Sequence, residues 1–197
     1  IKEFIFVTSR GKGALEDYFD QAPILEQELR KKGKDALLET LKHTNMESGA
    51  IAYIRQHQAL GLGHAVWCAR RLIANEPFAV ILPDDVIAAE TPCLKQMVEA
   101  YSETGGNMVA AMEVAPEKAG AYGVLDVKND MGSVVEARGM VEKPAMGEAP
   151  SNLAVIGRYI LEPSVLRNLN KMKQGAGGEI QLTDAIAQDI EKDVPVY

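Results

Sequence analysis

Hydrophobic residues follow two alternating periods over the first half of the chain. Short runs rich in β-branched and aromatic residues predict strands at 3–8, 50–56, 78–82 and 107–114. Longer segments with apolar residues at helical spacing predict helices at 13–19, 23–42, 62–73 and 92–103. Because parallel neighbours need a crossover connection, this order of strand and helix indicates strands that run in parallel.

The pattern changes in the second half of the chain. Between residues 120 and 161, β-rich runs follow one another with only short turns, which predicts hairpins. Two more helices are predicted at 163–172 and 180–192, with a glycine-rich loop at 175–178 between them. The sequence therefore predicts a Rossmann-like α/β fold, with a mixed, mainly parallel sheet and helices on both faces, in a single domain over residues 1–197.

Both ends of the chain fall within β-prone sequence. The first run, from Ile1 to Thr8, starts without a methionine or a leader, and residues 193–197 are β-prone residues that follow a helix. A further strand is expected to begin there. We therefore expect the chain to be part of a larger α/β protein, truncated at both ends.

Composition narrows the functional classes. With 197 residues, 47% hydrophobic and 25% charged, the chain can bury a sizeable core. Its net charge of −7 disfavours a nucleic-acid binder that works through a broad positive field. Its apolar stretches are too short to span a bilayer, so no membrane partner is expected. Cys68 and Cys93 stand alone, without metal-ligand spacing, which favours a reducing, cytoplasmic compartment.

The segment at residues 56–65 joins a predicted strand to a predicted helix. Gln56 offers both a donor and an acceptor, which suits the imide edge of a pyrimidine. Gly61 and Gly63 lie two residues apart, and glycines allow a planar ligand to approach the backbone closely. The alternative is an ordinary loop that leads into a helix.

Two adjacent carboxylates, Asp84 and Asp85, follow an apolar strand. In open α/β sheets, ligands bind at the carboxyl ends of strands. Mg²⁺ takes oxygen ligands and is usually held by one or two carboxylates together with substrate phosphates. The pair is therefore a candidate metal site, and the alternative is that both residues cap the next turn.

Adjacent opposite charges follow a later strand, at Glu142 and Lys143. Glu142 could accept hydrogen bonds from sugar hydroxyls, and Lys143 could neutralise a phosphate, although a surface ion pair is an equally good interpretation. Gly123 adds a place where a ligand could approach the backbone. Glu179 adds a carboxylate close to a helix N-terminus, where it could equally complement the helix dipole.

In their order along the chain, these segments resemble the sugar-nucleotidyltransferase family, in its branch that uses UTP and glucose 1-phosphate. The resemblance covers nearly the whole chain. It is carried by several motifs, among them Gly61-Leu62-Gly63-His64-Ala65, Leu82-Pro83-Asp84-Asp85, Val141-Glu142-Lys143-Pro144 and Gly178-Glu179-Ile180-Gln181-Leu182-Thr183-Asp184.

The resemblance implies a Mg²⁺-dependent transfer of a uridylyl group from UTP to glucose 1-phosphate, giving UDP-glucose and pyrophosphate without a covalent intermediate. It implies catalytic roles for Asp84, as the Mg²⁺ ligand, and for Lys143, at the phosphate. The implied substrate-binding positions are Gln56 and Gly61 at the uracil, and Gly123, Glu142, Lys143 and Glu179 around the glucose 1-phosphate. The family usually assembles as dimers or tetramers, so a homo-oligomer is expected.

The chain departs from the family pattern in two places. The family's glycine-rich triphosphate loop would precede Ile1, and its second metal-binding aspartate would follow Tyr197. We therefore expect the 197-residue chain alone to be inactive or severely impaired. Two alternatives stay open, a non-catalytic module that binds nucleotide sugars and a related transferase that uses dTTP or another hexose phosphate.

Overall fold

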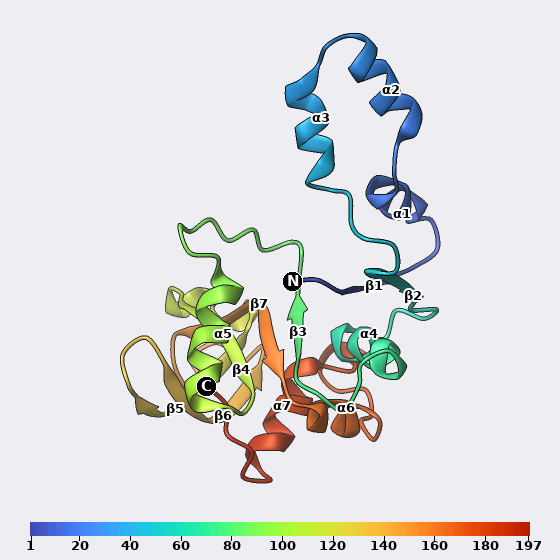
Figure 1. The fold of residues 1–197 in the computed structure, drawn as a ribbon. Helices are drawn as coiled ribbons and strands as arrows, with labels where there is room; N and C mark the ends of the chain where they lie inside the picture. Colours follow the sequence, from blue (N-terminus) through green and yellow to red (C-terminus); the bar gives the residue numbers. More distant parts are fainter. The chain divides into compact units, whose positions relative to one another are not determined.

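The computed structural model describes residues 1–197, apart from the side chain of Ala176. The chain forms two compact units, residues 1–59 and residues 60–197, and each is described by itself (Figure 1). The prediction of a single domain stays a prediction.

The first unit contains two strands and three helices. These are β1 (Phe4–Thr8), α1 (Gly13–Phe19), α2 (Pro23–Lys31), α3 (Asp35–Lys42) and β2 (Ile51–Arg55). The two strands pair in parallel, from Phe4 opposite Ile51 to Thr8 opposite Arg55, as their separation by helices predicted. The ring of Phe6 stacks on those of Phe19 and Tyr53, with centroids 5.1 and 5.6 Å apart, so aromatic contacts join α1 to the strands.

The prediction of a single helix at residues 23–42 is wrong, because Gly33 divides this segment into α2 and α3. Gly33 has a φ of +62°, a left-handed conformation that ends a helix at little cost in glycine. The N–H of Gly33 donates to the carbonyl of Arg30, and that of Lys34 to the carbonyl of Leu29. This pair of bonds is the Schellman motif, which satisfies carbonyls at the end of α2.

The second unit holds the remaining elements. Its α-helices are α4 (Leu62–Cys68), α5 (Cys93–Thr104), α6 (Pro163–Leu169) and α7 (Leu182–Ile190). Its 3₁₀ helices are η1 (Ala69–Arg71), η2 (Pro116–Ala121) and η3 (Ala176–Gly178). Its strands are β3 (Phe78–Ile81), β4 (Met108–Glu113), β5 (Gly123–Asp130), β6 (Val135–Glu142) and β7 (Leu153–Leu161). Each helix and strand predicted for this half is present, most within a few residues of the predicted bounds.

The long strand β7 organises the sheet of the second unit. It pairs antiparallel with β3, β4 and the first residues of β5, and β5 forms the predicted hairpin with β6. Since β3 and β4 both run antiparallel to β7, they point the same way but are not neighbours. The mixed α/β architecture is confirmed, and the antiparallel pairs arise because a strand from late in the sequence inserts between two earlier ones.

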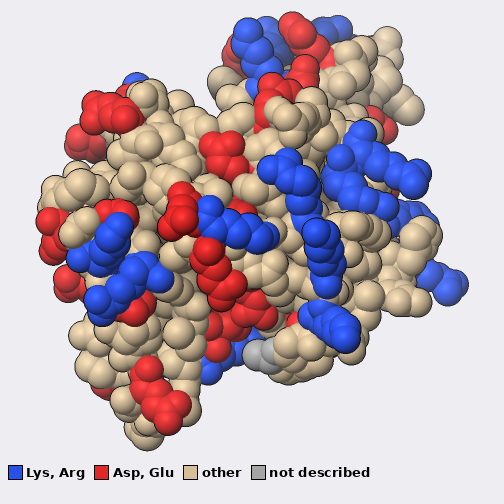
Figure 2. Space-filling view, turned by 90° about the horizontal axis from the view of Figure 1, so that it is seen from below, with Lys and Arg blue, Asp and Glu red and all other residues tan. Residues whose placement is uncertain are grey.

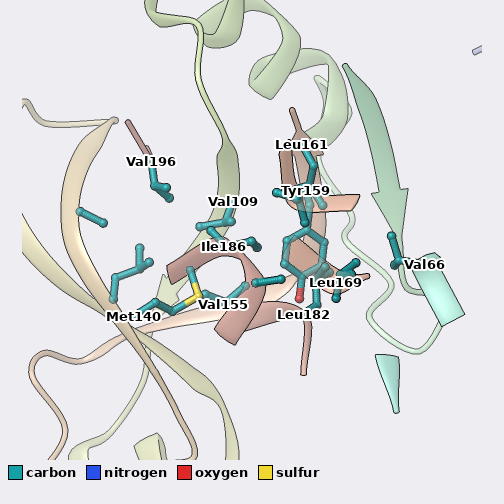
Figure 3. Packing of buried hydrophobic residues seen from close by; sticks show 14 residues of the cluster. Val66, Val109, Met140, Val155, Tyr159, Leu161, Leu169, Leu182, Ile186 and Val196 are labelled. Carbon is teal, nitrogen blue, oxygen red and sulfur yellow. The ribbon is translucent and has the colours of Figure 1, made fainter. Parts of the chain in front are cut away.

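Helices cover both faces of this sheet, as predicted. On one face, Met97 of α5 packs against Met108 and Ile160. On the other, α4, α6 and α7 contribute apolar side chains to the main core, and Figure 3 shows Leu169 and Leu182 beside the ring of Tyr159. Tyr159 and Ile160 are adjacent on β7 and serve opposite faces, which is the period of two expected of a strand buried on both sides.

Residues 195–197 add to the sheet, where the sequence predicted the start of a strand. Val196 bridges Asn107 in parallel and Ala137 in antiparallel orientation. The N–H of Tyr197 donates to the carbonyl of Asn107 over 2.9 Å, and the N–H of Ala137 donates to the carbonyl of Val196 over 2.8 Å. Val196 itself is fully buried, so this segment joins β4 to β6 through both hydrogen bonds and packing.

The surface carries charges of both signs. Acidic and basic side chains lie next to one another among uncharged residues on the face shown in Figure 2. Across the β5–β6 hairpin, Lys128 pairs with Glu136 at 2.7 Å and Arg138 pairs with Asp126 at 3.0 Å. Exposed pairs of this kind contribute little to stability. No helix in the described part of the chain has both the length and the apolar character needed to cross a membrane.

Candidate active site

The loop that carries Asp84 lies tightly against β7. It begins directly after β3, and the N–H of Leu82 donates to the carbonyl of Gly157 over 2.8 Å. Gly157 has a φ of +48°, and a Cβ placed there would lie 2.9 Å from Cβ of Leu82 and 3.2 Å from Oδ2 of Asp85. The close approach therefore depends on glycine at position 157, which sequence reasoning did not single out.

Arg158, the next residue of β7, holds the same loop. Its guanidinium donates to the carbonyls of Leu82 and Asp85, both over 2.6 Å, and to that of Gly157 over 3.0 Å. Asp84 and Asp85 therefore lie on a loop whose backbone carbonyls are hydrogen-bonded to Arg158. Sequence reasoning did not single out Arg158 either, because nothing in the local pattern indicates which loop faces β7.

A second group forms where β5, β6 and the start of α7 meet. Gly123 lies opposite Glu142 in the hairpin register. The hydroxyl of Thr183 donates to Oε2 of Glu142 over 2.8 Å. A Cβ at Gly123 would lie 2.8 Å from Cγ2 of Thr183 and 3.1 Å from Oε2 of Glu142. Glycine at position 123 therefore leaves room for the Glu142 carboxylate, and the hydroxyl of Thr183 fixes its orientation.

Lys143 has an unusual backbone. Its φ is +47°, and its N–H donates to the carbonyl of Tyr122 over 2.9 Å. A left-handed conformation in a non-glycine residue costs of the order of 1 kcal/mol or more, and such strain is often found at functional sites. Nζ of Lys143 lies 4.0 Å from Oε1 of Glu142, and the Lys143 side chain is about half exposed. The long separation argues against a tight surface ion pair and leaves the ammonium group accessible to a ligand.

The phenol of Tyr159 connects these two groups. Burial, and after it the negative charges of Glu142, Asp85 and Asp84, together raise its pKa to about 12. Glu142 and the Asp84–Asp85 loop, both in the second unit, therefore lie within electrostatic reach of the same phenol. The structure thus brings Gly123, Glu142 and Lys143 together, and Asp84 acts on the Tyr159 phenol through its charge.

Gly61 and Glu179 form a further contact within the second unit. Gly61 has a φ of +97°, and a Cβ there would lie 2.7 Å from Cβ of Glu179 and 2.9 Å from the carbonyl of Ile180. The N–H of Ile180 donates to the carbonyl of Leu60 over 2.7 Å, and that of Gly63 to the carbonyl of Ile180 over 2.8 Å. The glycines at 61 and 63 therefore allow the backbone at Glu179 and Ile180 to pack closely against this segment.

Gln56 lies in the first unit, directly after β2. Its N–H donates to the carbonyl of Thr8 over 2.9 Å, which continues the parallel ladder between β1 and β2. The Thr8 hydroxyl is buried and has no hydrogen-bond partner among the described residues. Buried polar groups nearly always have a hydrogen-bond partner, so the Thr8 hydroxyl is an unusual feature of this strand end.

The residues present fit a metal ion held jointly with substrate. Among the described residues, no group of three or more His, Cys, Asp or Glu side chains could hold a metal alone. Asp84 and Asp85 supply two hard oxygen donors at a strand end. That number suits a Mg²⁺-like ion that completes its coordination with phosphate oxygens and water.

A cavity of about 520 Å³ lies elsewhere in the second unit, between the start of α6 and residues 193–195. Pro163, Ser164 and Arg167 contribute to its walls, and none of the predicted site residues does. The residues with candidate chemistry lie instead on the Asp84 loop and beside Glu142.

Comparison with known proteins identifies the family of the chain. A family model described as nucleotidyl transferase matches residues 21–197. A UTP–glucose-1-phosphate uridylyltransferase from Komagataeibacter xylinus is 48% identical over 190 residues, which cover 96% of this chain and 67% of the relative. The protein of the same name from Bacillus subtilis (strain 168) is 47% identical over 186 residues, which cover 94% of this chain and 63% of the relative. The chain thus spans about two thirds of the length of these relatives.

Solved structures give the same result. A UDP-glucose pyrophosphorylase complexed with UDP-glucose superposes with a TM-score of 0.82 and 41% identity, over 98% of this chain and 71% of the other. A UTP-bound enzyme of this type from Acinetobacter baumannii superposes with a TM-score of 0.84 and 36% identity, over 100% of this chain and 69% of the other. The chain therefore belongs to the nucleotidyl transferase family, within the group of UTP–glucose-1-phosphate uridylyltransferases.

Proposed function

We propose that the whole protein transfers a uridylyl group from UTP to glucose 1-phosphate, forming UDP-glucose and releasing pyrophosphate. The observation that carries this proposal is the Glu142 carboxylate, oriented by Thr183, next to the accessible ammonium group of Lys143 and near the Asp84 loop. A sugar phosphate needs such a pair, an acceptor for its hydroxyls and a cation for its phosphate. The names and ligands of the relatives support the same reaction.

In the proposed reaction, a phosphate oxygen of glucose 1-phosphate attacks the α-phosphorus of UTP in line. The new P–O bond forms as the bond to the leaving pyrophosphate breaks, and no group on the protein becomes covalently attached. Catalysis of this kind rests on positioning and charge stabilisation. Glu142 would accept hydrogen bonds from the glucose hydroxyls, and Lys143 would hold the phosphate through its positive charge.

Further substrate contacts belong to the same proposal. Gln56 would pair with the edge of the uracil ring through its amide. Gly61 is proposed as a further uracil-binding position. Glu179 would lie near the sugar, on a turn that is closed by a 2.7 Å hydrogen bond from the N–H of Gly175 to its carbonyl. The backbone at Gly123 would lie against the sugar phosphate.

Enzymes of this family generally use a divalent metal. We propose Mg²⁺ for this protein, held by Asp84 with Asp85 adjacent. When bound, the ion would stabilise negative charge on the phosphates. The donor set of one or two carboxylates is the usual one for Mg²⁺ at a phosphate-transfer site.

The cellular setting is part of the proposal as well. Two isolated free cysteines suit the reducing cytoplasm. We also propose a homo-oligomer, a dimer or a tetramer, on the basis of the family resemblance. Light scattering of the whole protein measures that state directly.

The proposal is tested by assaying pyrophosphate release from the whole protein. UTP with glucose 1-phosphate should be the preferred pair, ahead of dTTP or galactose 1-phosphate. Asp84→Ala should lower kcat by at least about 10²-fold, as expected for loss of a main electrostatic stabiliser. Near-normal turnover would remove Asp84 from the catalytic site, and a preference for dTTP would favour the related transferase.

A further inference from the structure

Arg158 makes contacts that no role proposed so far explains. Its Nη1 donates to the carbonyl of Leu82 and its Nη2 to the carbonyl of Asp85, both over 2.6 Å. These two carbonyls lie on either side of Pro83 and Asp84. One planar guanidinium therefore bridges the ends of the segment that presents the metal-binding carboxylate, and a second bond from Nη1 to the carbonyl of Gly157 anchors it to β7.

The partners of Arg158 are backbone oxygens, although two carboxylates lie on the same loop. Among the residues that the structure describes, Arg158 forms no ion pair with Asp84, Asp85 or any other acidic side chain. An arginine that bound Asp84 through its carboxylate would compete with a metal ion for the same oxygens. Bonding to the carbonyls instead restrains the loop and leaves both carboxylates available.

The arrangement is specific to arginine. Only a planar fork with several N–H groups can donate to two carbonyls that flank a loop while also bonding its own strand. Lysine could supply the charge and an aliphatic stem, but its ammonium group is a single point that cannot reproduce this geometry. Gly157 complements the fork, because its missing Cβ lets the loop approach within 2.9 Å of that position.

We propose that Arg158 is a positioning residue, whose guanidinium fixes the backbone on both sides of Asp84 and thereby sets where its carboxylate meets the divalent cation. The inference rests on the proposed function, because it gives Arg158 a role in placing the ligand of the metal ion that the proposed reaction requires. Groups that orient metal ligands without touching the metal usually change metal affinity by about 10–100-fold when they are removed.

The test measures metal binding apart from turnover. Mn²⁺ serves as the probe because carboxylate and phosphate oxygens bind it as they bind Mg²⁺. Mn²⁺ is titrated into the whole protein saturated with UDP-glucose, and free Mn²⁺ is measured by electron paramagnetic resonance. Arg158→Met and Arg158→Lys are compared with Arg138→Met, which removes an exposed arginine that pairs only with Asp126.

Both Arg158 variants should weaken Mn²⁺ affinity about tenfold or more. Their affinity for UDP-glucose without metal should stay within about twofold, and Arg138→Met should match wild type in both respects. If Arg158→Met does not fold, Arg158→Lys alone decides, since it keeps the charge and the stem.

Wild-type Mn²⁺ affinity in Arg158→Lys would overturn the positioning role. An equal loss of Mn²⁺ and metal-free UDP-glucose affinity would also overturn it, because it would show general structural damage. If the wild-type whole protein binds no UDP-glucose, the proposed function fails before either variant is compared.

Discussion

The hydroxyl of Thr183 donates a hydrogen bond to Oε2 of Glu142 over 2.8 Å and so joins the start of α7 to the end of β6. The Glu142 side chain is largely buried, with an exposed fraction of 13%, so its orientation depends on few partners. Lys143 is the next residue, and Gly123 leaves the space that the carboxylate occupies. The proposed sugar-phosphate part of the site is therefore assembled by the β5–β6 hairpin and by α7, which begins about 40 residues after it.

Replacing Thr183 tests this arrangement. Thr183→Val keeps the shape of the side chain and removes the donor, so the Glu142 carboxylate loses its fixed orientation. A hydrogen bond to a charged group contributes about 1.5–3 kcal/mol, so affinity for UDP-glucose should fall about tenfold or more. Thr183→Ser keeps the hydroxyl and serves as the control in the same calorimetric titration. Equal affinities for the valine and serine variants would show that this bond does not orient Glu142 for the sugar.

A second prediction concerns Gly61, whose φ of +97° is combined with close contacts to Glu179 and Ile180. Gly61→Ala adds a Cβ that meets both, so it should reduce the free energy of unfolding by about 2–5 kcal/mol through strain and overpacking. Gly132 has a similar φ of +93° and open space around it, which makes Gly132→Ala the matched control for backbone strain alone. Urea denaturation compares the two. Similar losses in both variants would mean that the contact with Glu179 is unimportant.

The individual helices and strands could be predicted from the sequence, but the pairing of the strands within the sheet could not. The period of apolar residues locates β3, β4 and β7, yet it carries no information that β7 lies between the other two. For the same reason Asp84, Glu142 and Lys143 could be selected as chemistry-bearing residues, whereas Arg158, Thr183 and Tyr159 could not. Their roles depend on which loop or helix faces them, and that is set by the tertiary pairing of the strands.

The helix predicted at residues 23–42 shows a different failure. The apolar spacing continues across Gly33, so periodicity alone favours one helix. A glycine inside such a pattern is either tolerated in the helix or used as a cap, and the sequence does not decide between them. The cap bonds made by Gly33 and Lys34 decide it in the folded chain.

Asp189 forms a buried polar centre that no pattern in the sequence predicts. Its carboxylate is fully buried and accepts hydrogen bonds from Asn107, Ser164 and Asn168. Asp189→Asn turns one acceptor into a donor that faces other donors, so the free energy of unfolding should fall by about 3 kcal/mol or more. Glu191→Gln, at an exposed position nearby, should change it by less than about 0.5 kcal/mol. Thermal and urea unfolding measure both variants, and a loss under about 1 kcal/mol for Asp189→Asn would contradict the network.

The pKa of Tyr159 predicts an alkaline dependence of stability. In the folded chain its pKa is raised to about 12 by burial and then by the charges of Glu142, Asp85 and Asp84, against 10.0 in the unfolded chain. Between these two values the unfolded chain releases a proton that the folded chain retains. The stability from this group is therefore fully present below about pH 10 and lost as the pH rises toward 12. The loss reaches about 2–3 kcal/mol at most.

Tyr159→Phe isolates that effect. The free energy of unfolding of the wild type should fall more steeply between pH 9 and pH 11 than that of the variant, because only the wild type has this phenol. Absorbance at 295 nm gives an independent measure, since the difference between the two folded proteins should titrate near pH 12. A difference that titrates near pH 10 would show that the phenol is neither desolvated nor near the three carboxylates.

Binding of UDP-glucose with and without Mg²⁺ tests the central claim most directly. Isothermal titration of the 197-residue chain should show binding that tightens when Mg²⁺ is added. Asp84→Ala should bind UDP-glucose without metal as the wild type does, and should lose the gain from Mg²⁺, because Asp84 is the proposed ligand of the ion. If neither this chain nor the whole protein binds UDP-glucose under any condition, the assignment of Gln56, Asp84, Glu142 and Lys143 to a nucleotide-sugar site is wrong.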